Sequence, residues 1–343
     1  MKIFSDKHQQ GLTNSLRILF EDRLGGEIYF PIGMDWYPEF WDVQPFKETA
    51  QQFLTPNSQP YPHTPSVSKT LDSAEGIHLV ESFDGTPPTK GLEFERFKKE
   101  KFDLIIASIP QHVHKFLRLR DLYQPQAKLI FQIGNAWEFD SSFPIRNLLA
   151  SAKIPLLPGF NQVEYHEEFP LDVFRYEPVK NNRKVYSFIN CLNSVDLYRP
   201  DWELFLQLEK LLPDWEFKSF GGLCRDGSLG NIQDVADKMR EATFIFHCKT
   251  QGDGMGLSIH QAAAVGRPLI TRASDYRGKL AEPLIVDAGT AVTVDGQSPE
   301  KIAEIIKVDA VETMGLNIHR KFKEVVDFDA EEQKIREFLD RLQ

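Results

Sequence analysis

The chain has 343 residues, 41% of them apolar and 26% charged, which is typical of a folded globular protein long enough for two domains. Its formal net charge of −10 argues against binding nucleic acid through bulk positive charge. Its three widely spaced cysteines fit neither a zinc pattern nor a disulfide framework, so we expect a reducing, cytoplasmic compartment. No apolar run approaches the ~20 residues of a membrane span, and we expect no transmembrane segment.

Short apolar runs alternate with longer periodic segments in the first half, as in a parallel sheet covered by helices. The runs predicted as strands are 2–6, 27–33, 102–110 and 127–135. The segments predicted as helices are 12–26, which ends in glycine, and 112–123. From 47 to 75 the alternation breaks in a stretch rich in Pro, Ser and Thr, which we expect to be a long inserted loop.

The same rhythm restarts after a polar stretch near residue 180. The predicted strands are 185–190, 215–221, 243–248, 267–272, 283–287 and 290–295. The predicted helices are 201–212, 232–242, a small-residue helix from about 256 to 266, 298–307, 312–326 and 329–342. We therefore predict an α/β protein of two doubly wound, Rossmann-like domains, 1–180 and 181–326, that face each other across a cleft. Ligands of such domains bind at the carboxyl ends of the strands.

A glycine-rich loop lies where such a ligand would bind. Gly252, Gly254 and Gly256 follow the strand at 243–248 and precede the helix that contains "AAAVG". Glycine allows close approach of the backbone to a ligand, and the start of the helix offers free amides and a positive dipole end that suit a phosphate. An ordinary turn remains the alternative. The loop matches neither the P-loop nor the dinucleotide fingerprint.

The segment 253–270, "DGMGLSIHQAAAVGRPLI", resembles the donor-site signature of retaining GT-B glycosyltransferases, the group that includes glycogen and sucrose synthases (glycosyltransferase family 4). The signature is E-G-F-G-x(4)-E-A-x-A-x-G-x-P-V-I, and the spacing is kept without gaps. Gly254 and Gly256 fall on its glycines, and Met255 takes the place of Phe. Asp253 and Gln261 replace the two glutamates. The resemblance implies that Asp253 contacts the transferred sugar, that Gln261 holds the ribose hydroxyls, and that the backbone through Leu257 cradles the phosphates.

The resemblance also suggests cationic and first-domain contributors. Lys249 and Arg199 are the candidates for the leaving diphosphate, although the family's R-x(4)-K pattern is absent and solvated charges remain the alternative. Further cations of the second half are Arg267, Arg272 and Lys279. Gly11 would be the glycine of a loop after the first strand, and His112, past a later strand, would touch the sugar. The helix in 327–343 would cross back to the first domain.

These features together predict a glycosyltransferase that uses a UDP- or GDP-sugar, with retention of configuration and with neither a metal nor a bound cofactor. The acceptor is open between a glycan, a lipid-linked sugar and a small molecule. Three alternatives remain open: a non-catalytic sugar-nucleotide-binding protein of the same fold, a phage-type DNA-base glucosyltransferase, and a sugar-nucleotide epimerase. The acidic balance makes nucleic acid an unlikely partner.

Overall fold

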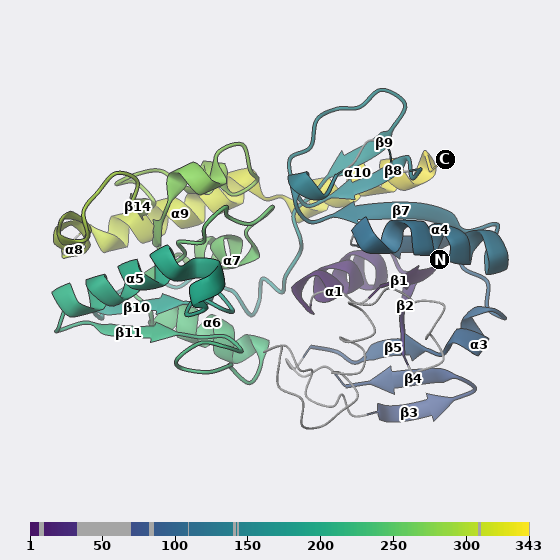
Figure 1. The fold of residues 1–343 in the computed structure, drawn as a ribbon, viewed down its shortest axis with the longest axis horizontal. Coiled ribbons are helices and arrows are strands. Elements are labelled where there is room, and N and C mark those ends of the chain that lie inside the picture. The colour runs from purple at the N-terminus through teal and green to yellow at the C-terminus, as the bar shows by residue number, and fades with distance from the viewer. Residues whose placement is uncertain are drawn as a thin grey trace. The chain divides into compact units, whose positions relative to one another are not determined.

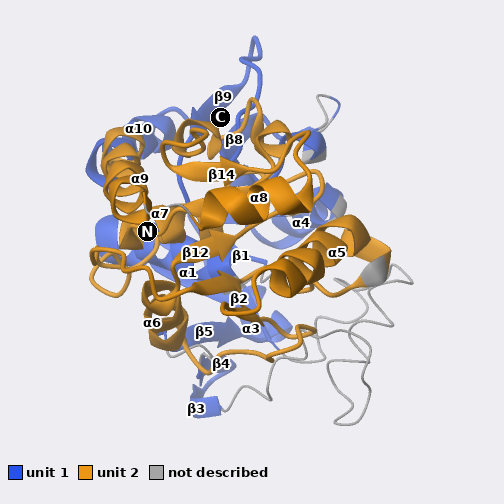
Figure 2. Cartoon of the chain, turned by 90° about the vertical axis from the view of Figure 1, so that its left-hand side faces the viewer, with its two compact units in different colours: residues 1–168, 328–343 blue, residues 169–327 orange. Residues whose placement is uncertain are grey.

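The computed structural model describes residues 1–6, 10–32, 70–81, 86–108, 110–139, 142, 144–307 and 310–342. It divides into two compact units (Figure 2): unit 1 comprises residues 1–168 and 328–343, and unit 2 comprises residues 169–327. The domain boundaries expected from the sequence, 1–180 and 181–326, stay a prediction.

Unit 1 is built on a nine-stranded sheet in the order β3-β4-β5-β2-β1-β6-β7-β8-β9 (Figure 1). The strands are β1 (Lys2–Ser5), β2 (Glu27–Pro31), β3 (Thr70–Ala74), β4 (Ile77–Val80), β5 (Thr89–Leu92), β6 (Leu104–Ala107), β7 (Lys128–Ile133), β8 (Asn147–Ala150) and β9 (Asn161–Glu164). From β5 through β9 neighbours pair in parallel, whereas β3, β4 and β5 form an antiparallel edge. The order reverses at β1, so the carboxyl ends of β1 and β6 mark the switch point of this sheet.

Successive residues of a strand point to opposite faces of the sheet. Because both sets are apolar here, helices cover both faces. Ile3 faces a core shared with α1 and α10, and Phe4 faces a second core shared with α3 and α4. The helical elements of unit 1 are α1 (Gln10–Arg17), the π-helical turn η1 (Ile18–Arg23), α3 (Phe94–Phe97), α4 (Pro110–Tyr123), the 3-10 turn η3 (Ala136–Glu138) and α10 (Phe328–Asp340). The C-terminal helix is thus part of the core of unit 1.

Unit 2 holds a fully parallel five-stranded sheet in the order β11-β10-β12-β13-β14. Its strands are β10 (Lys184–Ser187), β11 (Glu216–Ser219), β12 (Phe244–Phe246), β13 (Leu269–Thr271) and β14 (Ala291–Thr293). Its helical elements are α5 (Val195–Leu211), α6 (Ile232–Glu241), α7 (Leu257–Val265), η4 (Ala273–Tyr276), η5 (Glu282–Leu284), α8 (Pro299–Ile306) and α9 (Val311–Val325). The order reverses between β10 and β12, which places the switch point at their carboxyl ends.

Most of the elements predicted from periodicity are confirmed, including the Ser298 N-cap of α8, whose hydroxyl accepts a hydrogen bond from the amide of Lys301. Two expectations were wrong. The apolar run 283–287 is not a strand, because the 3-10 turn Glu282–Leu284 occupies its start. The end of the expected loop 47–75 forms the edge strand β3, while its part before Thr70 lies outside the described residues.

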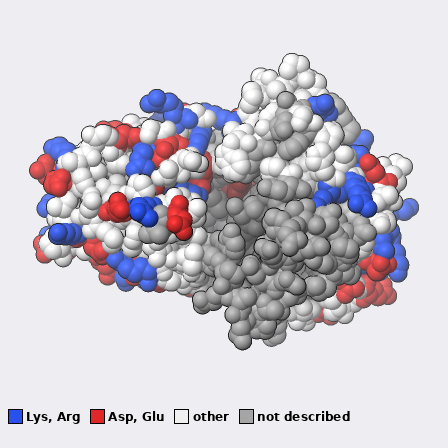
Figure 3. Space-filling model, in the orientation of Figure 1, with Lys and Arg blue, Asp and Glu red and all other residues white. Residues whose placement is uncertain are grey.

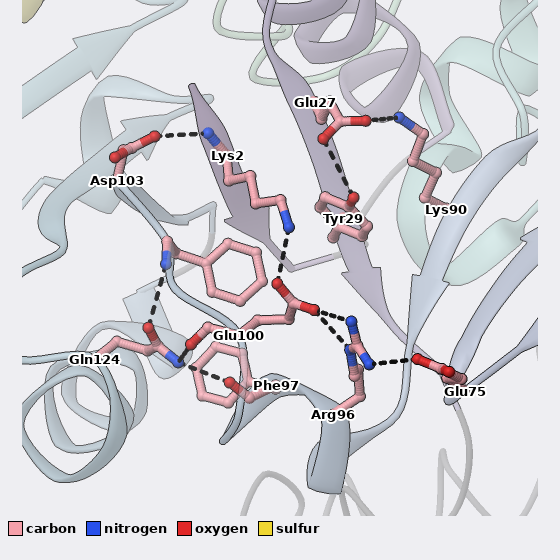
Figure 4. A network of polar contacts seen from close by, with 11 residues as sticks. Lys2, Glu27, Tyr29, Glu75, Lys90, Arg96, Phe97, Glu100, Asp103 and Gln124 are labelled. Atoms are coloured by element: carbon pink, nitrogen blue, oxygen red, sulfur yellow. Dashed lines mark hydrogen bonds and ion pairs between the residues drawn. The ribbon is translucent and has the colours of Figure 1, made fainter.

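A polar network borders the amino ends of the strands of unit 1, at the edge of the sheet opposite to the switch point (Figure 4). Lys2 pairs with Glu100 at 2.8 Å, and Arg96 joins Glu100 to Glu75. Gln124, directly after α4, donates to the carbonyl of Phe97 at the end of α3 at 2.6 Å and so ties the two helices together. These contacts stabilise the sheet edge and lie away from the end where ligands bind.

No helix within the described stretches of the chain is long and apolar enough to cross a membrane.

Candidate functional site

The glycine loop of unit 2 connects the carboxyl end of β12 to the start of α7, next to the switch point. Gly256 caps the helix with φ 80° and ψ 59°, and Gly252 has φ 63°, a left-handed conformation that favours glycine. A Cβ on Gly252 would lie 2.5 Å from the carbonyl oxygen of Asp275. The first turn of α7 holds no acidic side chain, and Leu257 at its start is only half-buried. The first amides of a helix have no intrahelical partner, so this end of α7 is of the kind that suits an anion.

Lys249 and Asp253 form an ion pair within this loop, and His247 lies behind it. Asp253 Oδ1 accepts from the ammonium group of Lys249, and His247 Nε2 lies 3.3 Å from Asp253 Oδ2. The side chains of Lys249 and Asp253 are 25% and 29% exposed, whereas that of His247 is 2% exposed. The ion pair is therefore reachable from solvent on one side.

The charge state of this pair follows from its surroundings. Burial favours a raised pKa for Asp253, but the hydrogen bond from His247 and the charge of Lys249 outweigh it and hold the pKa well below its usual range. Burial likewise favours a lowered pKa for Lys249, but the charge of Asp253 outweighs it and raises the pKa. Both groups are therefore ionised at neutral pH.

A buried carboxylate anchors the beginning of the loop. Asp201 of α5 is fully buried and accepts from the amide and hydroxyl of Thr250 at 2.8 and 2.7 Å. It also accepts from Arg272 at the end of β13, at 2.7 Å, and Arg272 reaches Asp275 at 3.2 Å. Asp201 thus joins α5, the loop and β13 at one edge of the sheet.

A third cation, Lys279, also contacts the glycine loop. The ammonium group of Lys279 donates to the carbonyl oxygen of Gln251. Burial lowers the pKa of Lys279, and the nearby positive charge of Lys249 acts in the same direction. Lys249, Arg272 and Lys279 therefore place three cationic groups around the glycine loop.

Other residues of the signature lie on or beside α7. Met255 is 3% exposed, so its side chain belongs to the core and only its backbone can face a ligand. Gly254 is also buried, and Gln261 is 8% exposed, one helical turn beyond Leu257. His260 Nδ1 lies 3.0 Å from the carbonyl oxygen of Gly256, which agrees with a packing role.

The C-terminal end of α7 is held by a buried arginine. Arg267 is 1% exposed and donates to backbone carbonyls, including those of Arg240 at 2.7 Å, Val265 at 2.9 Å and Glu177 at 2.7 Å. Arg240 and Val265 stand near the ends of α6 and α7, where the helix dipoles favour a cation. Burial lowers the pKa of Arg267 to about 10. Arg267 therefore belongs to the core and is not available to a diphosphate.

Gly266 lets α7 meet its neighbours closely at the same end. A Cβ on Gly266 would lie 2.6 Å from the ring of Tyr176, and one on Gly315 of α9 would lie 2.7 Å from the carbonyl oxygen of Gly266. The ring of Tyr176 also stacks on His319 of α9 at 4.3 Å. The closing G-x-P of the signature, Gly266 to Pro268, is thus a packing element.

Arg199 lies on α5 and is exposed. Its neighbour Tyr198 has non-helical angles (φ −132°, ψ 30°), and the ammonium group of Lys249 lies 6.0 Å from the Tyr198 ring. The structure thus brings the kink of α5 near Lys249. The role of Arg199 itself stays a prediction.

The first-domain candidates lie in unit 1. Gly11 was expected in a loop, but it lies in the first turn of α1, because the helix begins at Gln10. His112 was placed past the end of a strand, and it lies in the first turn of α4, 3% exposed. Its Nδ1 lies 2.7 Å from Asp6 Oδ2.

Asp6 is the centre of a buried cluster at the switch point of unit 1. The amide of Ser108 donates to both of its carboxylate oxygens, at 3.1 and 3.0 Å, and the Ser108 hydroxyl donates as well. The Asp6 side chain is 1% exposed. Sequence reasoning missed Asp6, His247 and Asp201. The signal for the first two was available, since each directly follows an apolar strand.

Within the described part of the chain, no group of three or more His, Cys, Asp or Glu side chains is arranged to hold a metal ion.

Comparisons with known proteins agree on the architecture. No protein-family model matches the chain, and no curated protein matches its sequence. Solved structures do match over the full length. HepE of Anabaena, in complex with UDP and glucose, has a TM-score of 0.62 at 13% identity, with 100% of both chains covered.

Two further structures are similar. TarM of S. aureus, in complex with UDP and other ligands, has a TM-score of 0.60 at 11% identity, with 98% and 99% of the two chains covered. Sucrose-phosphate synthase from Thermosynechococcus elongatus has a TM-score of 0.59 at 9% identity, with 99% and 98% covered. At such identities the likeness shows the fold, which is an α/β fold of the GT-B type.

Proposed function

We propose that the chain is a glycosyltransferase that transfers a sugar from a nucleotide-sugar donor, and that the donor binds to unit 2. The observation that carries this proposal is the N-terminus of α7 at the switch point, with the partly exposed Lys249–Asp253 pair beside it. HepE and TarM, which are similar in fold, were seen with UDP. This supports a UDP-sugar as the donor rather than a GDP-sugar.

The residues of the loop suit different parts of such a donor. The amides from Gly254 to Leu257 would hold the diphosphate, because helix N-termini bind phosphate well. Lys249, which pairs with Asp253 of the same loop, would neutralise it further. Asp253 would accept hydrogen bonds from hydroxyls of the transferred sugar. Gln261, an uncharged donor and acceptor, would hold the ribose diol.

Catalysis at such a site depends on charge stabilisation. As the bond from sugar to phosphate breaks, negative charge grows on the leaving diphosphate, and fixed cations and amides stabilise it without reorganisation. Retention of configuration would follow if the acceptor hydroxyl attacked on the side from which the phosphate leaves and gave its proton to that phosphate. Because Lys249 and the helix end supply the positive charge, we propose transfer without a metal. His112, Gly11 and Arg199 stay predicted contributors, and the acceptor remains open.

A second candidate function is binding of a sugar nucleotide without transfer. Two observations favour it: Gln261 replaces a carboxylate, and Lys249 and Asp253 are already paired with each other. A ligand would have to compete with Asp253 for Lys249.

Two measurements separate the candidates. The thermal transition of the chain should rise with UDP and with UDP-glucose, and less with GDP. UDP release from UDP-sugars should be measurable, slow without acceptor and faster with sugar acceptors. A rise in the thermal transition temperature without any release of UDP would support binding alone. No rise with any nucleotide would contradict both candidate functions.

The site residues are tested by matched variants. Asp253→Asn and Lys249→Met should each lower UDP release by about 100-fold, the usual effect of removing one electrostatic contact from a transition state. Asp237→Asn and Lys301→Met remove exposed charges of the same unit that are already paired elsewhere, and they should leave the rate unchanged. Equal rates in all four variants would remove the assignment.

A further inference from the structure

His247 is a buried histidine directly after β12, and the proposed reaction gives it no role so far. Its side chain is 2% exposed, whereas those of Lys249 and Asp253 beside it are 25% and 29% exposed. A buried ring next to a partly exposed carboxylate either fills space or fixes that carboxylate. The contacts of His247 distinguish these two roles.

The backbone of His247 is held by the neighbouring strand. Its amide donates to the carbonyl oxygen of Ile270 at 2.8 Å, and its carbonyl oxygen accepts from the hydroxyl of Thr271 at 2.8 Å. Both partners belong to β13 and are fully buried. The imidazole also lies beside the fully buried ring of Tyr276, with the ring centres 6.1 Å apart. The position of the imidazole is therefore set by the sheet and its core and not by the glycine loop.

Two hydrogen-bond donors hold the two oxygens of the Asp253 carboxylate. His247 Nε2 lies 3.3 Å from Oδ2, and the ammonium group of Lys249 donates to Oδ1. Lys249 has a flexible four-carbon chain that reaches solvent, and the proposed function directs its charge to a diphosphate. His247 has no such freedom. It is therefore the partner that can keep its contact with Asp253 while a nucleotide sugar is bound.

The proton between His247 and Asp253 is assigned by the surroundings. An ionised carboxylate only accepts hydrogen bonds, so the proton lies on Nε2. Nδ1 is buried and has no hydrogen-bond partner among the described residues. A second proton on Nδ1 would leave a buried N–H without an acceptor, which is costly. The tautomer with a single proton, on Nε2, therefore fits this site.

The surface charge of unit 2 is mixed in sign on the face that Figure 3 shows, with basic and acidic groups side by side. Exposed charges of both signs largely cancel at a distance, and salt screens them. The ionisation and the direction of Asp253 therefore depend on its immediate hydrogen bonds.

We propose that His247 is a positioning residue for sugar transfer. Its Nε2–H fixes the Asp253 carboxylate through Oδ2 and leaves Oδ1 for a hydroxyl of the transferred sugar when Lys249 turns to the diphosphate. The inference rests on the proposed function and adds to it which partner of Asp253 is exchanged and which stays. Because a rigid partner orients Asp253 beforehand, the carboxylate need not be reoriented as the sugar binds.

Variants of His247 test this role through the rate of UDP release from UDP-glucose. His247→Leu removes the N–H but keeps the bulk, and should lower kcat by about tenfold with little change in the affinity for UDP, because only the sugar contact is misplaced. His247→Gln should restore most of the rate, since its amide can donate from a similar place. Equal losses in both variants would overturn the proposal, because they would show that the ring only fills space.

His319→Leu is the matched control. It removes a histidine of α9 whose Nδ1 lies 2.8 Å from the carbonyl oxygen of Ala264, and it should leave kcat unchanged. The same loss of kcat in His319→Leu as in His247→Leu would overturn the proposal, because the effect would then follow from a weakened fold. Circular dichroism of each variant confirms that the fold is retained.

A double variant shows whether His247 acts through Asp253. In the background of Asp253→Asn, His247→Leu should cause little further loss, because the effects of residues that act as a unit do not add. A full further loss would overturn the proposal, since His247 would then act independently of Asp253.

Nitrogen NMR of the unchanged protein tests the contact without any turnover. In a sample with labelled histidines, the signals that His247→Gln removes belong to His247, and they should show a proton on Nε2 at neutral pH. A bare Nε2 would overturn the proposal, because it could not donate to Asp253. No release of UDP by the unchanged protein would contradict the proposed function and the positioning role together. Release that His247→Leu does not lower would contradict the positioning role alone.

Discussion

The two units place a carboxylate beside a histidine at the carboxyl ends of their strands, but in opposite environments. In unit 1, Asp6 is 1% exposed and receives hydrogen bonds from Ser108 and His112. In unit 2, Asp253 is 29% exposed and pairs with Lys249 in front of His247. The first carboxylate is locked into the protein, and the second keeps one side toward solvent.

This difference separates a carboxylate that the protein alone surrounds from one that solvent reaches. A fully buried carboxylate must have its oxygens satisfied by fixed donors, since an unpaired buried charge is very costly. Asp6 satisfies this requirement and orders the start of α4. Under the proposed function, Asp253 would exchange a protein partner for a hydroxyl of the donor, because solvent already reaches it.

The largest expected effect is on the free energy of unfolding, and its absence would contradict the difference between Asp6 and Asp253. Asp6→Ala leaves Ser108 and His112 without their acceptor and should lower the free energy of unfolding by about 3 kcal/mol. Asp253→Ala should cost less, about 1 kcal/mol: Lys249 can turn to water, and the loss falls mainly on buried His247. Urea unfolding measures both. Equal losses would mean that Asp253 is as structural as Asp6.

The loop that carries Asp253 gives the next effect. Gly252→Ala should cost about 2 kcal/mol, because the left-handed backbone is strained and the new Cβ would lie 2.5 Å from the Asp275 carbonyl. Gly278→Ala is the control: it has φ 72° but nothing within 4 Å of its Cβ, and should cost about 1 kcal/mol. Thermal unfolding compares them. A smaller cost at Gly252 would contradict the tight approach.

The pH dependence of the free energy of unfolding tests the difference between Asp6 and Asp253 further. The pKa of Asp253 is lowered in the folded state, so the unfolded chain takes up a proton near pH 4 while the folded chain stays ionised. The resulting stability is present above about pH 4 and is lost as pH falls further, and it should amount to about 1 kcal/mol. Asp253→Asn should show a correspondingly smaller loss between pH 6 and pH 3 in urea unfolding. An equal loss of stability in Asp253→Asn and in the unchanged protein would contradict this prediction.

The smallest effect concerns the pair itself. Lys249→Met should raise the pKa of the Asp253 carboxyl, because the charge of Lys249 helps to lower it. NMR titration of the labelled carboxyl would measure the shift. Lys301→Met, at an exposed pair with Glu304, should leave that pKa in place. An unmoved pKa in Lys249→Met would assign the shift to His247 alone.

Periodicity alone predicted most of the fold. Buried parallel strands such as Leu104–Ala107 and Phe244–Phe246 are continuous apolar runs, and such runs are easily recognised. The antiparallel edge was missed because β3 is exposed along its whole length and carries no apolar pattern. The run at 283–287 was apolar enough for a strand, but packing and turn geometry made a 3-10 turn of its start.

The site could be predicted only where residues are neighbours in sequence. The glycines, Lys249 and Asp253 lie on one loop, so the strand–loop–helix pattern places them together. Asp201 comes from α5, far earlier in the chain, and no local sequence pattern predicts its contacts with Thr250 and Arg272. Arg267 was a candidate cation because sequence cannot tell an exposed arginine from one buried among carbonyls.

The C-terminal end of α7 is fixed by contacts with its neighbours. Arg267, Gly266 and Tyr176 fix its C-terminus against α6 and α9, while its N-terminus follows a loop built on glycine. The position of α7 is therefore set at its far end by contacts that are separate from those of the preceding loop, where Asp201 holds Thr250 and Lys279 holds Gln251. Amide hydrogen exchange should accordingly stay slow along α7 even when the contacts of the loop are removed by substitution.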